Sequence, residues 1–355
     1  MLVLGIESSC DETAASVVRR DGTRPGVCSN VIASQAELHA EYAGVVPEIA
    51  SRAHVERIVP VIRRALSEAD VAAHDLDLIA IGNRPGLIGA LLVGLAAAKA
   101  IAWSTSTPIL GVDHIHAHLT AGLLDADHDH AEVFPALGLA ASGGHTAIYR
   151  LESPTEIARL GGTIDDAVGE AFDKAATMLG LGYPGGPIID QLATRGDPRA
   201  HDFPISRLDR GSLDLSFSGL KTALLYTVRG TPMPGPDGKP VFPRDHTSLL
   251  GEEIADIAAS FQRAAVEALL LKLERAGAAH PDVRALLVGG GVSANSLLRE
   301  RLAELANERA IELRLPAMAY CLDNAAMIAG HALHLWDAGV RDDLSLAGAP
   351  TGATA

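Results

Sequence analysis

Histidine recurs at every second position in one short segment of this sequence. The run Val112-Asp-His-Ile-His-Ala-His118 carries His114, His116 and His118. In a helix His114 and His118 lie one turn apart on the same face, and in a strand all three share a face. Imidazole nitrogens at this spacing are suited to bind a metal ion. The residues alone leave metal binding and ordinary hydrogen bonding as equal alternatives.

The positions around the histidines limit the metal chemistry that is available. A metalloprotease needs the sequence His-Glu-x-x-His, in which the glutamate is the general base beside the metal-bound water. Ile115 stands where that glutamate should be, so the protease interpretation is poor. A third ligand must come from elsewhere, and Asp323 directly precedes an alanine-rich helical stretch, residues 325–335. The commonest role of such an aspartate is the helix N-cap, which the residues alone favour over a metal ligand.

Carboxylates and glycines also gather between residues 166 and 190. Asp166, Glu170 and Asp173 are spaced four and three apart, which predicts one helix face with three carboxylates. Carboxylates this close need solvent, a cation or sugar hydroxyls as partners. The glycine-rich turn at 183–187 with Asp190 behind it could clamp a ribose, although generic turn chemistry explains it equally well.

Three turns of small or polar residues follow strand-like runs, and two of them are rich in glycine. Backbone N–H groups at such turns, and at the start of a following helix, suit a phosphate or the polar edge of a base. The Gly-Lys-Ser/Thr motif of other nucleotide folds does not occur. The order of hairpin, hairpin and strand–turn–helix resembles the phosphate and adenosine loops of the actin-like, sugar-kinase and Hsp70 ATPase fold. The three turns span residues 7–13, 141–146 and 289–295.

Strands and helices are expected to alternate around these turns. Such alternation predicts a parallel or mixed sheet covered on both faces. Residues 230–243 are crowded with Pro and Gly and indicate an exposed inserted loop, and residues 347–355 are expected to be a disordered tail. Helices are expected at 53–69, 89–103, 166–179, 252–276, 296–309 and 325–335, and strands at 2–6, 14–18, 78–81, 109–112, 136–140, 147–151 and 284–288.

Length, charge and cysteine usage bound the class of protein. A chain of 355 residues suggests about two domains, and a formal net charge of -15 repels nucleic acid and anionic membranes as a whole. Residues 195–244 carry a local positive charge, with eight Lys or Arg against five Asp. A solvated face is a commoner explanation of such a charge count than a binding surface. The three cysteines form no C-x-x-C pair, which is typical of reduced, cytosolic proteins. The longest apolar run, 85–98, is expected to be too short to span a bilayer.

Seven longer motifs appear in an order that is similar to one protein family. From residue 1 to about 335 the chain resembles the TsaD proteins (also called Gcp or YgjD), which are tRNA adenosine-37 threonylcarbamoyltransferases. The motifs are Gly5-Ile-Glu-Ser-Ser-Cys-Asp-Glu-Thr13, Gly44-Val-Val-Pro-Glu-Ile-Ala-Ser-Arg52, Ser142-Gly-Gly-His-Thr146, Glu170-Ala-Phe-Asp-Lys174, Tyr183-Pro-Gly-Gly-Pro187, Phe217-Ser-Gly-Leu-Lys-Thr222 and Gly290-Gly-Val-Ser-Ala-Asn295.

The resemblance implies an α/β protein with the actin-like, sugar-kinase and Hsp70 ATPase (ASKHA) fold, in which two duplicated α/β lobes surround a central cleft. We expect the N-terminal lobe to comprise residues 1–112 and 325–346, and the C-terminal lobe residues 113–324. The implied reaction transfers the threonylcarbamoyl group from threonylcarbamoyl-AMP to N6 of adenosine 37 in tRNAs that read ANN codons. It forms t6A and releases AMP.

The resemblance also implies the site residues by motif position. The metal ligands would be His114, His118 and Asp323, holding one divalent ion per chain, Fe²⁺ in preference to Zn²⁺. Asp11 or Glu12 could orient the attacking amine or accept its proton, or could simply shape the first loop. Asp173 and Asp190 are expected on ribose or other polar atoms of the donor, and Asn295 near the base. The full donor site would comprise Ala140, Ala141, Ser142, Gly143, Gly144, Asp173, Gly186, Asp190 and Asn295.

The implied partners are tRNA, a TsaB-like heterodimer partner and a TsaE-like ATPase, in the cytoplasm and without a membrane. A small-molecule kinase of the same fold would leave the histidine pair unexplained, and a non-catalytic scaffold paralogue is expected to lack the metal ligands. Besides the apparent insertion at 230–243, the chain departs from the family in three places. His116 replaces the usual glutamate and could add a ligand or shift the metal preference; residues 82–87 replace Gly-Pro-Gly-Leu; and Ala325 stands where Gly is usual.

Overall fold

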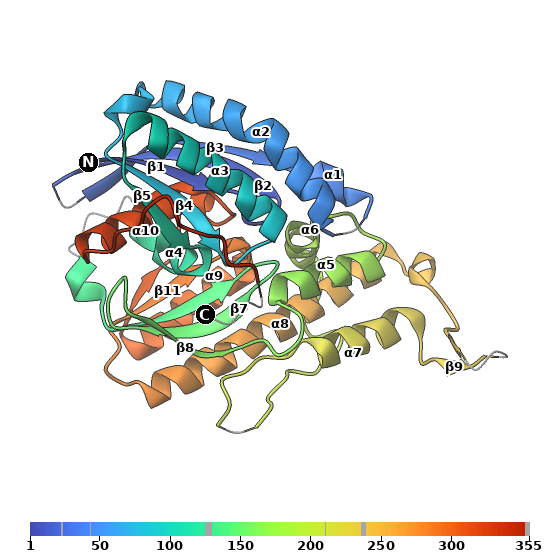
Figure 1. Ribbon diagram of the computed structural model, residues 1–355. Helices are drawn as coiled ribbons and strands as arrows, with labels where there is room; N and C mark the ends of the chain where they lie inside the picture. The colour runs from blue at the N-terminus through green and yellow to red at the C-terminus, as the bar shows by residue number, and fades with distance from the viewer. Residues whose placement is uncertain (23, 43, 125–129, 210, 236–238, 352–355) are drawn as a thin grey trace.

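The computed structural model describes residues 1–351 except 23, 43, 125–129, 210 and 236–238, and Figure 1 shows two sheets with helices around and between them. The first sheet has the strand order β3-β2-β1-β4-β5. Strands β1 and β2 are antiparallel, as are β2 and β3, whereas β4 is parallel to β1 and β5 is parallel to β4. The strands are β1 (Leu2–Glu7), β2 (Glu12–Asp21), β3 (Arg24–Ser34), β4 (Leu78–Arg84) and β5 (Ile109–Asp113).

The second sheet repeats this pattern. Its order is β12-β11-β6-β7-β8, with an antiparallel β6-β7-β8 meander, with β11 parallel to β6 and with β12 parallel to β11. The repeated topology, in which an antiparallel hairpin (β1-β2 and β6-β7) begins each sheet, confirms the predicted ASKHA fold. The strands are β6 (Ala136–Ala141), β7 (Thr146–Leu151), β8 (Ile157–Gly162), β11 (Ala285–Gly289) and β12 (Glu312–Arg314).

Helices cover both faces of the first sheet, which is why its central strands are apolar on both sides. On β4, Ile79 and Ile81 pack in one cluster with α2 (Pro47–Glu68) and α3 (Ile88–Thr105). Leu78 and Ala80 point the other way and pack against α10 (Ala325–Asp337). The last helix of the chain therefore returns to the first sheet.

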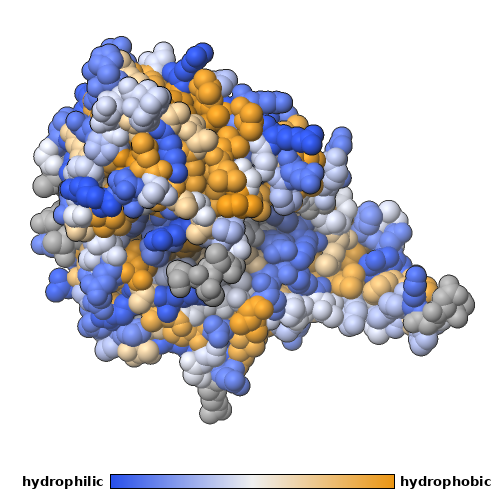
Figure 2. Space-filling view, viewed as in Figure 1, coloured by the Kyte–Doolittle hydropathy of each residue, from blue (hydrophilic) through white to orange (hydrophobic). Residues whose placement is uncertain are grey.

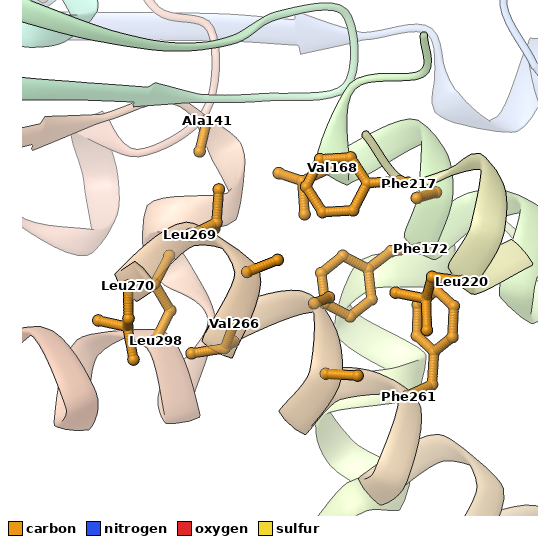
Figure 3. Packing of buried hydrophobic residues seen from close by; sticks show 14 of the residues in the cluster. Ala141, Val168, Phe172, Phe217, Leu220, Phe261, Val266, Leu269, Leu270 and Leu298 are labelled. Carbon is orange, nitrogen blue, oxygen red and sulfur yellow. The ribbon is translucent and has the colours of Figure 1, made fainter. Parts of the chain in front are cut away.

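The second sheet has a thick helical layer on one face. Leu286 and Val288 of β11 belong to a core that includes the rings of Phe172 and Phe261, which meet edge to face (Figure 3). On the opposite face, Leu287 packs with the short helix α4 (His114–Thr120). The helices of the thick layer are α5 (Val168–Met178), α6 (Gly185–Ala193), α7 (Ser218–Arg229), α8 (Gly251–Ala279) and α9 (Ser296–Arg309).

Two helices connect the sheets. Helix α4 follows the last strand of the first sheet, α10 follows the second sheet, and the two pack against each other between the sheets (Figure 1). The chain thus crosses from one sheet to the other on α4 and returns on α10. The division into lobes at 112/113 and 324/325 stays a prediction.

Several segments differ from the sequence expectations, among them strand β3 and helices α6 and α7, which were not expected. The apolar run continues as helix to Thr105, so α3 is long and apolar enough to cross a membrane by length and composition, a test that core helices of soluble proteins also pass. One turn of helix, α1 (Ala36–Ala40), was not expected. Within the predicted tail, Ala349 and Thr351 donate backbone hydrogen bonds to Asn83 and Gly86, and 352–355 lie outside the described residues.

Apolar side chains gather on the outer surface over α3 in Figure 2. Leu92 and Trp103 of α3 are exposed, as are Val55 and Val59 of α2. The inserted loop at 230–243 forms a minimal hairpin of β9 (Met233–Pro234) and β10 (Pro240–Val241) that projects from the body (Figure 1). Residues 236–238 of that loop lie outside the described residues.

Candidate metal centre and its surroundings

The start of α4 determines which way its histidines face. Asp113 is the N-cap, and its Oδ1 accepts hydrogen bonds from the backbone N–H groups of Ile115 and His116 at 2.9 and 3.1 Å. The helix therefore begins at His114, and His114 and His118 lie one turn apart on the same face. Their rings meet edge to face, with centroids 4.6 Å apart.

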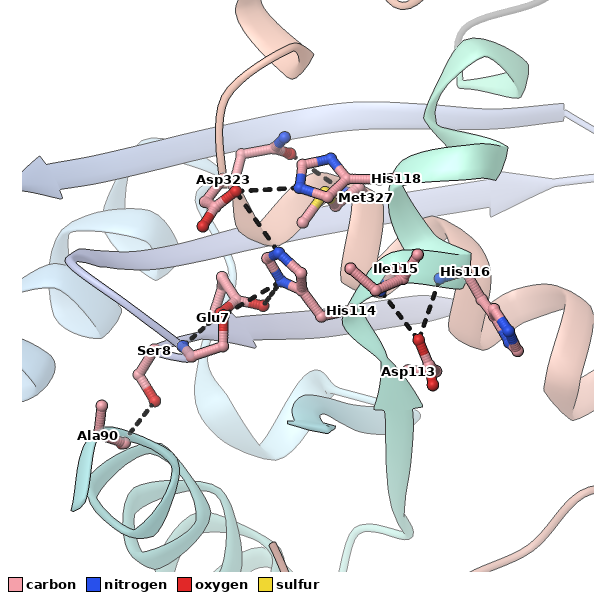
Figure 4. Close-up of polar contacts among 12 residues, drawn as sticks. Glu7, Ser8, Ala90, Asp113, His114, Ile115, His116, His118, Asp323 and Met327 are labelled. Atoms are coloured by element: carbon pink, nitrogen blue, oxygen red, sulfur yellow. Dashed lines mark hydrogen bonds and ion pairs between the residues drawn. The ribbon is translucent and has the colours of Figure 1, made fainter. Parts of the chain in front are cut away.

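Asp323 completes a three-residue group with this pair (Figure 4). Its Oδ1 lies 2.9 Å from Nε2 of His118 and 3.5 Å from Nε2 of His114. The three potential ligand atoms all lie within 4.8 Å of one another, and both histidines are buried. Two imidazole nitrogens and one carboxylate oxygen are a donor set that suits Zn²⁺ or a non-haem Fe²⁺. This group could hold a metal ion.

Asp323 is not the N-cap of α10, because its neighbour Asn324 takes that role. Oδ1 of Asn324 accepts the hydrogen bond from the backbone N–H of Met327 at 3.0 Å. The residues alone favoured Asp323 as the cap, and this is wrong because Asn324 is equally capable and sits one residue closer to the helix. Asp323 is thereby free to turn toward the histidines.

A buried glutamate supports the metal-binding interpretation. Oε2 of Glu7, the last residue of β1, lies 3.0 Å from Nδ1 of His114, and Glu7 is fully buried. Oε1 of Glu7 accepts from the backbone N–H of Ser9 at 2.5 Å. A carboxylate on the rear nitrogen of a histidine is the usual support of a metal-ligating imidazole, because it fixes the tautomer and turns the other nitrogen outward.

Charge in this group is balanced between acids and imidazoles. Burial would lower the pKa of His114, but the carboxylates of Asp323 and Glu7 raise that pKa well above its usual value. Burial would raise the pKa of Asp323, but His114 and His118 hold it well below its usual range. The His114 imidazole thus stands between two carboxylates, at the place where a bound cation would take over the balance of charge.

His116 points away from these residues (Figure 4). Its ring lies beside Tyr149 and His331, with centroids 6.3 and 6.1 Å away, and it is not a member of the three-residue group. Burial lowers the pKa of His116. The expectation that His116 could add a ligand therefore does not hold, because the helix turns it away from the facing pair.

Two consecutive glycines join the metal group to the predicted donor loop. A Cβ on Gly289 would overlap the backbone carbonyl of His118, and a Cβ on Gly290 would overlap that of Ala141. Gly290 also has a φ of 92°, which favours glycine. The C-terminal ends of β6 and β11 therefore meet α4 directly. Ala140 and Ala141 are buried in β6, and Gly143 and Gly144 form an open turn with space around their Cα atoms.

The predicted ribose residues are already engaged with backbone. Oδ1 of Asp173 accepts from the N–H of Gly185 at 2.7 Å, at the start of α6 and beside Gly186. Burial raises the pKa of Asp173, although the N–H groups of Gly185 and Gly186 oppose the shift. Asp190 accepts from the N–H and the hydroxyl of Ser296, and Asn295 is the N-cap of α9 through Leu298.

The expected row of three carboxylates on one helix face is wrong. Helix α5 begins at Val168, so Asp166 precedes it and instead forms ion pairs with Lys174 and Lys221. Glu170 also pairs with Lys174, at 2.8 Å. The carboxylate of Asp166 therefore ties α5 to α7, and only Asp173 remains turned toward α6.

Asp11 and Glu12 lie at the turn between β1 and β2. Burial and the neighbouring Asp11 raise the pKa of Glu12 to about 9. The charge of Asp323 also contributes to this rise, so the first turn and the metal group share one electrostatic environment. His54 of α2 holds the turn, with Nε2 2.9 Å from the carbonyl of Cys10 and Nδ1 2.8 Å from the hydroxyl of Thr13.

Sequence reasoning missed two polar residues that hold the site together. Glu7 carries a signal that could have found it, because it is an ionisable residue directly after the apolar run 2–6, within the motif at 5–13. Gln262 lies in the middle of the long helix α8, is 3% exposed and bonds both Asp190 and Asn295. Nothing in the local pattern around Gln262 indicates this role.

Comparison with known proteins assigns this arrangement to a family. The family model described as TsaD, tRNA N6-adenosine threonylcarbamoyltransferase, matches residues 26–330. A relative from Trichlorobacter lovleyi and one from Sorangium cellulosum carry the name tRNA N6-adenosine threonylcarbamoyltransferase. Each is 48% identical, over 346 and 359 residues respectively, and both alignments cover 98% of this chain and 95% of the relative.

A solved structure shares the fold at low identity. The crystal structure of HypF from T. kodakarensis superposes on 97% of this chain with a TM-score of 0.60 and 15% sequence identity. This chain spans 49% of that protein. The likeness concerns the fold alone.

Proposed function

The chain belongs to the TsaD family and is a tRNA N6-adenosine threonylcarbamoyltransferase; from this premise we propose the details of its reaction. The donor is threonylcarbamoyl-AMP, and the acceptor is N6 of adenosine 37 in tRNAs that read ANN codons. The single observation that carries the proposal is the direct contact of the glycine pair 289–290 with His118 on one side and Ala141 on the other. It brings a candidate metal group against a candidate nucleotide loop.

The proposed step balances without a covalent enzyme intermediate. The N6 amine attacks the carbamoyl carbonyl carbon, a new C–N bond forms, and the C–O bond to phosphate breaks as AMP leaves. Because the mixed anhydride is already activated, no Ser or Cys nucleophile is required. The open turn at Gly143 and Gly144 offers backbone N–H groups to the departing phosphate. The amine proton needs an acceptor.

Asp11 and Glu12 are the two carboxyl groups at the first turn that could take the amine proton or orient the amine. Burial and the neighbouring Asp11 raise the pKa of Glu12 to about 9. One of the pair accepts the proton while the other orients the amine by hydrogen bonding.

The metal ligands are His114, His118 and Asp323, with Fe²⁺ preferred over Zn²⁺. When bound, the ion would hold the donor and polarise its carbonyl oxygen. The residues around it position the ligands: Glu7 fixes the tautomer of His114, and Asp113 fixes the start of α4. The donor is held by residues 140–144 together with Asp173, Gly186, Asp190 and Asn295.

The same premise leads to the proposed setting. The enzyme acts in the cytoplasm with a TsaB-like heterodimer partner and a TsaE-like ATPase, and it binds no membrane. The partners supply part of the tRNA contact, because the chain carries a formal net charge of -15.

The test is nucleoside mass spectrometry on unmodified tRNA. The tRNA is incubated with threonylcarbamoyl-AMP, this protein and its proposed partners, and a parallel reaction contains His118→Ala. We expect t6A with the wild type and none with the variant. Equal product from both would leave the transfer standing and remove the histidines from it. No product from either, with intact donor, would contradict the proposed function.

A further inference from the structure

A buried amide connects two residues of the proposed donor pocket. Gln262 lies on α8, and its side chain reaches between Asp190 of α6 and Asn295 at the start of α9. The inference that follows rests on the proposed function, because it takes Asp190 and Asn295 as donor-binding residues. We propose that Gln262 is a positioning residue that sets the direction of both side chains at once.

The orientation of each side-chain amide in this series of contacts follows from which of its partners can donate a hydrogen bond and which can accept one. The backbone N–H of Leu298 can only donate, so the atom of Asn295 that faces it, at 2.9 Å, is the oxygen. The Nδ2 group of Asn295 must then face Gln262, where it donates to Oε1 at 2.8 Å. Gln262 is left with its Nε2 group turned toward Asp190, and donates to Oδ1 at 3.1 Å.

This series of hydrogen bonds ends at the carboxyl group of Asp190. Asp190 Oδ1 accepts from Gln262 and from the Ser296 hydroxyl, at 2.7 Å, while Oδ2 accepts from the Ser296 N–H, at 3.1 Å. Each carboxylate oxygen can accept about two hydrogen bonds. A second acceptor position of Oδ2 is therefore suited to a ribose hydroxyl. Asn295 likewise has a second N–H and a second lone pair that the donor can use.

Packing alone does not explain a glutamine at this position. Most of the α8 residues near Gln262 are apolar and buried, including Ala258, Phe261 and Val266, and a Leu or Met would fill the same space. Burying an amide is unfavourable unless both its ends are hydrogen-bonded. Gln262 satisfies that condition only because Asp190 and Asn295 lie on opposite sides of it. The residue joins three helices into one pocket wall.

The test compares three variants of the full-length protein by titration with AMP, the proposed leaving group. Gln262→Met keeps the volume and removes both hydrogen bonds. Gln262→Glu keeps the bond from Asn295 but places an acceptor against Asp190. We expect both to weaken AMP binding by about tenfold or more, the effect of losing a buried hydrogen bond to a charged group. Gln191→Glu, an exposed neighbour of Asp190 on α6, adds the same charge outside this series of hydrogen bonds and should bind AMP as the wild type does.

A double variant separates positioning from general damage. In Gln262→Glu with Asp190→Asn, the amide introduced at position 190 can donate to the carboxylate introduced at position 262 and restore the broken link. The double variant is expected to bind AMP more tightly than Gln262→Glu alone, with tRNA affinity and melting temperature close to those of the wild type. Additive losses, or Gln262 variants that bind AMP normally, would overturn the inference. Failure of the wild type itself to bind AMP would instead count against the proposed function.

Discussion

A single buried carboxylate determines what His114 can do. Glu7 lies behind the imidazole at 3.0 Å, is fully buried and is itself held by the N–H of Ser9. With the rear nitrogen engaged, only Nε2 can face Asp323. Glu7 therefore determines which nitrogen of His114 is available to a metal ion, since without Glu7 the same histidine could adopt either tautomer.

Replacing Glu7 tests that dependence. Glu7→Gln keeps the shape but removes the negative charge behind His114, which makes the imidazole a weaker ligand. We expect the affinity for Zn²⁺ or Fe²⁺ to fall about 10- to 100-fold, the usual effect of losing such a support. Competition with a chelator measures the metal affinity directly and needs no assay of enzyme activity. Glu56→Gln, an exposed glutamate on α2, is the control; metal affinity that is equal in Glu7→Gln and the wild type would refute the role.

At the scale of elements, the site depends on how closely a helix can approach a strand. Gly289 at the end of β11 leaves room for the carbonyl of His118, and Gly5 in β1 leaves room for the carbonyl of Ala325 at the start of α10. The two connecting helices thus each pack on a glycine of a central strand. Helix α4 and its ligands could not lie so near the second sheet over any other residue.

Gly289→Ala tests this packing. The added methyl group would overlap the backbone of α4, which cannot move aside as a side chain can. We expect a loss of about 1–3 kcal/mol in the free energy of unfolding and weaker metal binding, because α4 must shift. Thermal melting and metal titration measure the two effects. Gly251→Ala, at the open first residue of α8, should change neither; a wild-type-like Gly289→Ala would show that α4 is not constrained there.

Elements with a clear apolar period could be predicted from local patterns, whereas β3, α6 and α7 were missed and the contacts between elements were predicted less well. The helix at 296–309 has the bounds that the sequence predicts, because Asn295 caps it and its leucines follow a helical period. The prediction for Asp166 is wrong, because the pattern of acidic spacing cannot show that the helix begins two residues later. The role of Asp323 could be predicted only with the knowledge that its neighbour Asn324 is the N-cap of α10. Gln262 could not be predicted, because its partners come from two other helices.

At the scale of the whole molecule, electrostatics opposes the proposed substrate. The formal net charge is -15, and several cations of the window 195–244 are already used internally. Lys221 pairs with Asp166, Arg229 lies over the ring of Phe242 at 4.6 Å, and Arg244 donates to the carbonyl of Thr227. These engaged charges contribute less to tRNA binding, which agrees with a role for partner proteins in that binding.

Charge reversal tests the remaining patch. Arg207 is exposed, and Arg210 lies outside the described residues. We expect Arg207→Glu with Arg210→Glu to lower tRNA affinity several-fold and to make it less sensitive to salt, while AMP binding stays normal. Filter binding at two salt concentrations measures the effect. Arg63→Glu with Arg64→Glu, on α2, is the matched control, and unchanged tRNA affinity in the first pair would reject this surface.

The position of Asp323 along the chain has a consequence for biosynthesis. His118 and Asp323 are separated by 205 residues, and the second sheet is made entirely between them. A nascent chain therefore completes the first sheet and both histidines long before the third ligand is synthesised. Because an unfolded chain cannot hold ligands so far apart together, an ion has no complete site to bind until translation is nearly finished. Metal loading should accordingly be a late, post-translational event.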